Sequence, residues 1–107
     1  MISIIGGSGF VGSKLISELK SKNCQNLDKN LSHFFNPITT ISDIRNKDEI
    51  VFNSNSKAVV LLAAEHRDDV SPVSLYYDVN VEGTRNVLDK MDEAGIKHLI
   101  FTSSVAI

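Results

Sequence analysis

The sequence has little of what marks a secreted, membrane-spanning or zinc-binding protein. Its 107 residues include one cysteine, two prolines and no tryptophan. A single cysteine, Cys24, cannot form an internal disulfide or a zinc cluster, so we expect a reducing, cytoplasmic setting rather than secretion. The longest apolar runs, such as residues 58–64, fall well short of the roughly 20 residues that span a bilayer. We therefore expect no membrane partner.

An excess of one sign of charge is also absent. Eleven Lys and Arg residues against thirteen Asp and Glu residues give a net charge of −2, and the two signs are interspersed. Such a balance offers no basic face for a phosphate backbone, so nucleic acid is not an expected partner. Hydrophobic residues at 42% and charged residues at 22% are typical of one soluble globular domain over residues 1–107.

Short apolar runs alternate with longer amphipathic stretches. The runs predict strands over residues 2–5, 24–28, 38–41, 58–63 and 97–103. Amphipathic spacing predicts a helix over 10–22 that presents one face made of Val11, Gly12, Leu15, Ile16 and Leu19. A short helix is expected over 47–52, and a long one between the cap signals Ser71-Pro72 and Gly95. This alternation is typical of a parallel α/β sheet with right-handed crossovers.

The segment Gly6-Gly7-Ser8-Gly9-Phe10-Val11-Gly12 leaves the first strand and opens the first helix. A Cβ atom at Gly6 or Gly9 would obstruct the close approach of a diphosphate to backbone N–H groups. The free amides of the first helical turn, which includes Phe10 and Val11, would then face that anion. Gly12 would let the helix pack closely against the strand. A glycine-rich turn without a ligand is the alternative.

Asp28 closes the second predicted strand, where a dinucleotide site needs a partner for the adenosine ribose. Its carboxylate could accept hydrogen bonds from both ribose hydroxyls and would repel a 2′-phosphate, which favours NAD over NADP. Lys29, next to it, could instead accept such a phosphate, and an ordinary solvated aspartate is a further alternative.

On the long predicted helix, Asn80 shares a face with apolar residues. That face must cover the sheet, so the Asn80 amide is expected to be buried and hydrogen-bonded, since an unpaired buried amide costs roughly 1–3 kcal/mol. Bonds to main chain alone would satisfy it equally well. The other residues of this face are Val73, Tyr76, Gly83, Thr84, Val87 and Met91.

Five blocks of residues together resemble the extended short-chain dehydrogenases/reductases, in the NAD-dependent epimerase/dehydratase branch. The similarity is strongest to sugar-nucleotide 4-epimerases of the UDP-galactose 4-epimerase type. The blocks are Gly6 to Gly12, Ser42-Asp43-Ile44-Arg45, Leu62-Ala63-Ala64, Tyr76 to Thr84 and Phe101 to Ile107. The resemblance implies a Rossmann-type three-layer fold with a mostly parallel sheet of about five strands in the order 3-2-1-4-5, truncated relative to the family.

The same resemblance assigns residues to the cofactor NAD. Asp43 would accept from the exocyclic amine of adenine, with Ile44 as an apolar wall, although Asp43 could instead cap the short helix. The cofactor would lie against the end of the fourth strand at Leu62, Ala63 and Ala64, and Asn80 would hold the cofactor or the backbone beside the active site.

The remaining implied residues belong to the reaction. Ser104 matches the catalytic hydroxyl, and Ser103 lies beside it as a second candidate that could contact the cofactor. His66, after the fourth strand, is a candidate for the substrate pocket, which in the family holds a nucleotide sugar. Neither the histidines nor the carboxylates are spaced as a metal site.

The family's base, a tyrosine followed four residues later by a lysine, has no match. Tyr76 is followed at that spacing by Asn80, and Tyr77 by Val81. We therefore expect the amino-terminal, NAD-binding part of an epimerase or dehydratase, without the carboxyl-terminal substrate domain and inactive alone. A non-catalytic NAD-binding module or a subunit of a split enzyme is the alternative. Sheet surface left bare near Phe101 and Ile107 predicts self-association or a missing carboxyl-terminal chain.

Overall fold

A computed structural model of the chain describes residues 1–32, 34–62 and 78–101, with 78–80 described by their backbone alone. Five strands and two α-helices lie within these residues, joined by short 3₁₀ turns and one π-helical segment. The elements are β1 (Ile2–Ile5), α1 (Phe10–Leu19), η1 (Ser21–Asn23), β2 (Cys24–Asp28), η2 (Asn36–Ile38), β3 (Thr39–Ile41), η3 (Lys47–Glu49), β4 (Ala58–Leu61), η5 (Asp78–Gly83), α3 (Thr84–Ala94) and β5 (His98–Phe101).

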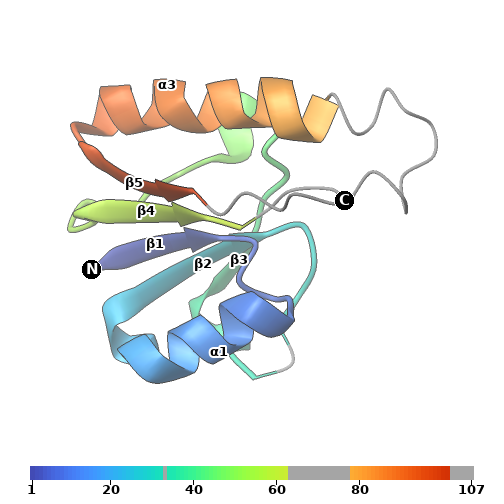
Figure 1. Cartoon of the computed structure of the whole chain (residues 1–107), viewed down its shortest axis with the longest axis vertical. Helices are drawn as coiled ribbons and strands as arrows, with labels where there is room; N and C mark the ends of the chain where they lie inside the picture. Colours follow the sequence, from blue (N-terminus) through green and yellow to red (C-terminus); the bar gives the residue numbers. More distant parts are fainter. Residues whose placement is uncertain (33, 63–77, 102–107) are drawn as a thin grey trace.

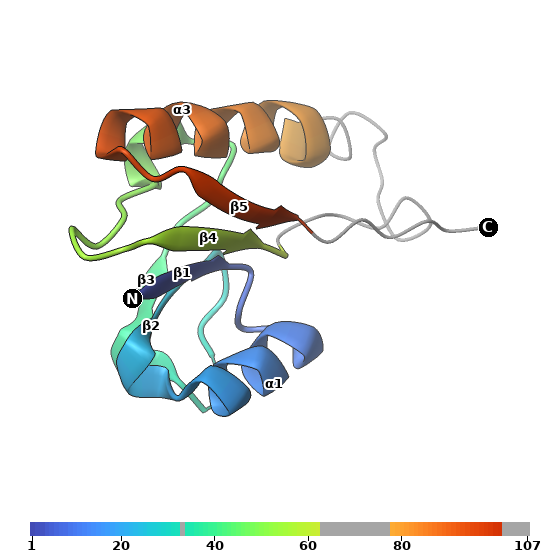
Figure 2. The same ribbon diagram turned by 60° about the vertical axis from the view of Figure 1, so that its left-hand side comes forward.

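The strands form one parallel sheet in the order β3-β2-β1-β4-β5. Ile2 in the central strand β1 is in register with Cys24 of β2 on one side and Ala58 of β4 on the other. Helix α1 lies on one face of the sheet and α3 on the opposite face, as the two views in Figures 1 and 2 show. The predicted Rossmann-type fold and its strand order are confirmed.

Two hydrophobic clusters occupy the two faces of the sheet, as a parallel sheet requires. Successive residues of β1 alternate between them: Ile4 packs on the α1 side with Ile16, and Ile5 packs on the α3 side. Val87 and Met91 bring α3 onto that second cluster, with 0% and 4% of their surfaces exposed. The predicted inner face of the long helix is thus correct at these two residues.

Helix α1 begins at Phe10 as predicted, but its carboxyl end and the burial of its first turn differ from the prediction. It stops at Leu19 rather than at residue 22, because Lys20 takes a φ of 74° and turns the chain out of the helical path. Val11, expected on the buried face, is 62% exposed. Val11 belongs to the first turn of α1, which lies at the carboxyl ends of the strands (Figure 1).

The helix predicted over 47–52 is a single 3₁₀ turn, Lys47–Glu49. Glu49 turns its side chain back to the N–H of Asp43 and to the amide of Asn46, at 3.0 and 2.8 Å. Ile50, the next residue, is extended and only 1% exposed. Burial of Ile50 in the core therefore ends the helix after one turn.

Within the described residues, the carboxyl-terminal helix and strand lie where the sequence predicts them. Gly95 ends α3 in the left-handed conformation, and its N–H donates to the Asp92 carbonyl at 3.2 Å. The predicted start of the long helix at Ser71-Pro72 lies outside the described residues. β5 begins at His98 and forms an edge of the described sheet, with Ile100 57% and Phe101 48% exposed. Among the described residues, no helix is long and apolar enough to cross a membrane.

Candidate functional site

The loops that follow the strands begin side by side at the carboxyl edge of the sheet. Backbone hydrogen bonds extend the ladder one residue past the strand ends, from Gly6 N to Leu27 O, Ser42 N to Asp28 O and Leu62 N to Ile5 O, each at 2.8 Å. The glycine loop, the loop after β3 and the end of β4 are therefore held at one level. Ligands of open α/β sheets bind at this edge.

The glycine loop folds tightly against the first turn of α1. Gly6 has a φ of 89°, a conformation that side-chain-bearing residues rarely adopt. A Cβ atom on Gly12 would lie 2.8 Å from both the Gly6 carbonyl oxygen and the Gly7 carbonyl carbon. The backbone closest to Gly12 is therefore that of the glycine loop itself. The loop needs a glycine at this position to fold back against α1.

Gly9 faces open space. A Cβ atom there would find its nearest neighbour, the Gly6 carbonyl oxygen, only at 4.0 Å. Gly9 is the N-cap of α1 and has no side chain to cap the helix, whose first backbone bond is Ser13 N to Gly9 O at 2.9 Å. The amides of Phe10, Val11 and Gly12 belong to the first turn, where N–H groups lack intrahelical acceptors. This geometry suits an anion at the helix end.

Asn26 in β2 holds the loop from below, a role that sequence reasoning missed. Its side-chain oxygen accepts from Gly7 N at 2.9 Å, and its side-chain nitrogen donates to Ser8 Oγ at 3.2 Å and Thr39 Oγ1 at 3.0 Å. The residue is 0% exposed. A Cβ atom on Gly7 would lie 2.9 Å from Asn26 Cγ, so the second glycine leaves room for this amide. A polar residue within a buried parallel strand was the available signal.

Asp28 is 9% exposed, so the alternative of a solvated loop aspartate is wrong. Its two carboxylate oxygens accept from main-chain N–H groups, Oδ2 from Ser8 and Oδ1 from Asn30, each at 2.9 Å. Asp28 thus fixes the glycine loop and its own loop together. Each oxygen keeps acceptor capacity for a further donor, and the predicted contact with ribose stays a prediction.

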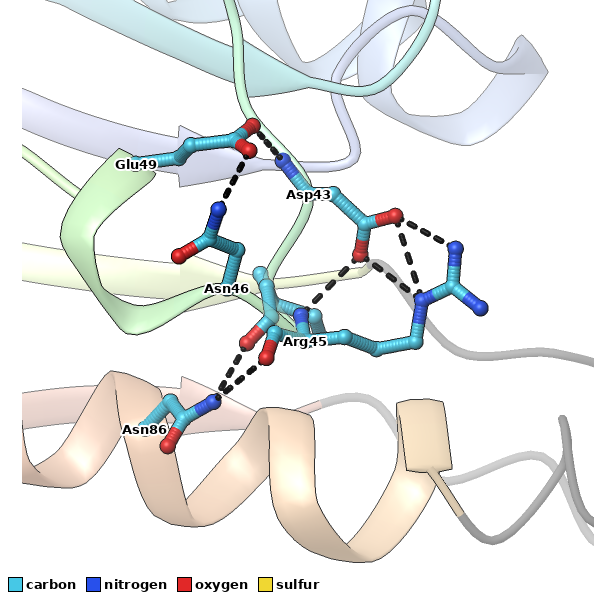
Figure 3. A network of polar contacts seen from close by, with 6 residues as sticks. Asp43, Arg45, Asn46, Glu49 and Asn86 are labelled. Atoms are coloured by element: carbon cyan, nitrogen blue, oxygen red, sulfur yellow. Dashed lines mark hydrogen bonds and ion pairs between the residues drawn. The ribbon is translucent and has the colours of Figure 1, made fainter.

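The loop after β3 carries an ion pair between Asp43 and Arg45 (Figure 3). Asp43 Oδ2 accepts from Arg45 Nη2 at 2.6 Å, and Oδ1 accepts from the Arg45 backbone N–H at 3.0 Å. The hydrogen bond from the Arg45 side chain holds the pKa of the Asp43 carboxyl below its ordinary value. The cap of η3 is Asn46, whose side chain accepts from Asp48 N, so the alternative that Asp43 caps this helix is wrong.

The structure describes three of the other predicted site residues and leaves the rest outside the described residues. Ile44 is 4% exposed and packs in the α3-side cluster. At this position the surface of the loop is therefore formed by the backbone of Ile44 rather than by its side chain. Leu62 follows β4 and packs against the α1-side cluster. Asn80 lies within the π-helical segment η5, and such segments are frequent at functional sites. Ala63, Ala64, His66, Ser103 and Ser104 lie outside the described residues.

A groove of about 490 Å³ runs beside α1 from the glycine loop. Phe10, which is 86% exposed, and Phe34, which is 77% exposed, belong to its walls. The full lining is Ser8, Gly9, Phe10, Ser13, Lys14, Ser17, Phe34 and Phe35. Within the described part of the chain, no group of His, Cys, Asp or Glu side chains is arranged to hold a metal ion.

Comparison with known proteins gives consistent matches along the chain. Residues 3–107 match the model of the 3-beta hydroxysteroid dehydrogenase/isomerase family. N-acetyl-alpha-D-glucosaminyl-diphospho-ditrans,octacis-undecaprenol 4-epimerase of Escherichia coli O157:H7 is 55% identical over 108 residues, which cover 99% of this chain and 33% of that protein. UDP-glucose 4-epimerase of Rhizobium meliloti is 30% identical, with 98% of this chain and 35% of that protein covered.

Among solved structures, a short-chain dehydrogenase/reductase superfamily protein from Agrobacterium tumefaciens with bound NAD matches with a TM-score of 0.80. It is 27% identical over 97% of this chain and 32% of that chain. These matches confirm the similarity to extended short-chain dehydrogenases/reductases that the five sequence blocks predict. The chain spans about a third of the length of the relatives that it matches.

Proposed function

Because the chain belongs to the 3-beta hydroxysteroid dehydrogenase/isomerase family, we propose that residues 1–107 are the NAD-binding part of a sugar 4-epimerase-like oxidoreductase. The single observation that carries the proposal is the glycine loop at the carboxyl edge of the sheet. It combines open space at Gly9 with an uncapped helix start. NAD would supply hydride exchange, and this chain's residues would hold it.

Each end of the dinucleotide has candidate partners. The diphosphate would lie against the amides of the first turn of α1, at Phe10, Val11 and Gly12, where the helix dipole favours negative charge. The ribose next to adenine would donate to Asp28. A carboxylate at this place disfavours a 2′-phosphate, so we propose NAD rather than NADP as the cofactor.

The substrate we propose is a sugar joined through a diphosphate. The name of the relative from Escherichia coli O157:H7, 55% identical to this chain, describes a 4-epimerase of an N-acetylglucosaminyl-diphospho lipid. The Rhizobium meliloti relative is named for a nucleotide sugar. His66 is proposed for the substrate pocket, and Ser104, with Ser103 beside it, for the hydroxyl that contacts the reacting sugar.

Catalysis by these residues alone is not expected, because they contain no tyrosine followed four positions later by lysine. We propose that a carboxyl-terminal polypeptide supplies this base and the substrate domain. The exposed Ile100 and Phe101 on β5 favour contact with such a polypeptide or with a second copy of the chain. The buried free thiol of Cys24 suits the cytoplasm, where we propose that the protein works.

Titration calorimetry with NAD and NADP tests the cofactor. We expect NAD to release or absorb heat and to raise the melting temperature, and NADP to bind more weakly. Gly9→Leu should abolish binding without unfolding the chain, because a side chain there meets open space rather than protein. The absence of both heat and a thermal shift with millimolar NAD would overturn the proposal.

Complementation tests the part played in catalysis. The remaining two thirds of a long relative, added in trans, should restore epimerisation if the chain is a subunit of a split enzyme. NAD binding without any restored activity would favour the second candidate, a non-catalytic NAD-binding module.

A further inference from the structure

The loop after β3, residues 42–46, lies beside Asp28 at the carboxyl edge of the sheet. Ser42 N donates to the Asp28 carbonyl oxygen at 2.8 Å, which joins this loop to the strand end proposed for the adenosine ribose. The position of the loop therefore decides what surrounds the adenosine half of the dinucleotide. The contacts that hold the loop in place therefore affect binding of the dinucleotide.

Helix α3 is hydrogen-bonded to this loop through Asn86 (Figure 3), beside the hydrophobic contact of Ile44 with the α3-side cluster. Its side-chain nitrogen donates to the Ile44 carbonyl oxygen at 2.9 Å and to the Arg45 carbonyl oxygen at 3.3 Å. Asn86 lies in the first turn of α3 and is half-buried. One amide group thus bonds two consecutive carbonyls of a loop that is distant in the sequence.

The peptide group between Ile44 and Arg45 is held at both of its polar atoms. Its carbonyl oxygen accepts from Asn86, and its N–H donates to Asp43 Oδ1 at 3.0 Å. A planar peptide bonded at both ends cannot rotate about its flanking bonds without breaking one of the two hydrogen bonds. Asn86 therefore fixes the peptide that orients the Asp43 carboxylate.

We propose that Asn86 is a positioning residue for the adenosine end of the dinucleotide, acting through the Ile44–Arg45 peptide rather than by contact with the ligand. The inference rests on the proposed NAD function. Without Asn86, Asp43 and Arg45 keep their ion pair and the loop keeps its bonds to Asp28 and Glu49. The peptide between Ile44 and Arg45, however, loses the hydrogen bond that fixes its carbonyl end.

A contact between α3 and η3, the turn that follows this loop, provides a matched control. Lys47 Nζ and Asp89 Oδ2 are 2.7 Å apart and join η3 to α3, but this ion pair bonds neither carbonyl that Asn86 holds. Both side chains are more than a third exposed, at 41% and 46%, and exposed pairs contribute little to stability. Asp89→Asn removes a tie between the elements and leaves the peptide fixed.

The experiment compares Asn86→Ala, Asn86→Asp and Asp89→Asn with the wild-type chain, by calorimetry with NAD and ADP-ribose at a temperature where thermal melting shows all four to be folded. Asn86→Asp keeps the shape but has no donor for the carbonyls. We expect both Asn86 variants to weaken binding of both ligands about tenfold, the size of a lost hydrogen bond or two. Asp89→Asn should bind like the wild type.

Amide NMR spectra distinguish a positioning role of Asn86 from a purely structural one. In both Asn86 variants, NAD should still shift the amides of Gly6 and Gly9 but no longer those of Asp43 and Arg45. Unchanged affinity in the Asn86 variants, an equal loss in Asp89→Asn, or equal loss of both sets of NMR shifts would overturn the inference while the wild type still binds NAD. A wild-type chain that does not bind NAD would overturn the proposed function, and this inference with it.

Discussion

Gly12→Ala should destabilise the chain although it replaces glycine by the best helix former. The added Cβ would lie 2.8 Å from the Gly6 carbonyl oxygen and the Gly7 carbonyl carbon, closer than real Cβ atoms approach backbone. Backbone cannot rotate aside as a side chain can, so the loop must shift away from α1. Overpacking of this kind costs about 1–3 kcal/mol, against a helix-propensity gain of up to about 1 kcal/mol.

With the full propensity gain subtracted, the net loss of unfolding free energy still reaches about 2 kcal/mol, which in a domain of this size lowers the melting temperature by up to about 10 °C. Thermal unfolding followed by circular dichroism measures it. Gly9→Ala is the matched control, because its φ of −78° is ordinary and its Cβ would be 4.0 Å from the nearest atom. We expect Gly9→Ala to change the melting temperature little, because the cost of alanine at the N-cap opposes the gain from a less flexible unfolded chain. A Gly12→Ala variant as stable as Gly9→Ala would refute the tight fold of the loop.

Three further outcomes follow from contacts described above. Asn26→Leu leaves the N–H of Gly7 without its acceptor, so the unfolding free energy from urea titration should fall by about 1–3 kcal/mol; an unchanged value would contradict the loop support. Because Arg45 lowers the pKa of Asp43, the stabilisation is present at neutral pH and lost as the pH falls through that lowered pKa. The melting temperatures of Arg45→Met and wild type should therefore differ most near pH 7 and converge in acid, and a constant difference would count against the ion pair. Ile100→Lys should reduce any self-association seen by analytical ultracentrifugation, because it places a charge on the β5 edge; a wild type monomeric at all concentrations would remove the basis for this expectation.

The strand positions were predictable because each strand of a parallel sheet is a short apolar run between turn signals. The bounds of β2, Cys24–Asp28, agree with the sequence prediction. The exposed Val11 was not predictable from helical spacing, because spacing indicates which residues share a face but not how far the sheet extends beneath that face. The same limit explains η3, whose length depends on a distant core that buries Ile50.

The candidate site also has a part that the sequence predicts and a part that it does not. The glycine loop could be recognised because its glycines are needed by the local geometry of a single turn. The hydrogen-bond partners of Asn26 and Asn86 could not be assigned, although Asn26 stands out as a polar residue in a buried strand, because they bind loops 19 and 42 residues away along the chain. Nothing in their immediate neighbours indicates which carbonyl or N–H the fold will place opposite the amide.

The central place of β1 also has a consequence for synthesis on the ribosome. Among the described strands, β1 is followed soon in the sequence by its partner β2, but its other edge pairs with β4, which is synthesised much later. In the interval, β1 is a half-paired strand with one open side and an uncovered apolar face. Nascent chains of this topology fold slowly and are prone to intermolecular pairing, so chaperone contact is expected until Ala58–Leu61 has left the exit tunnel.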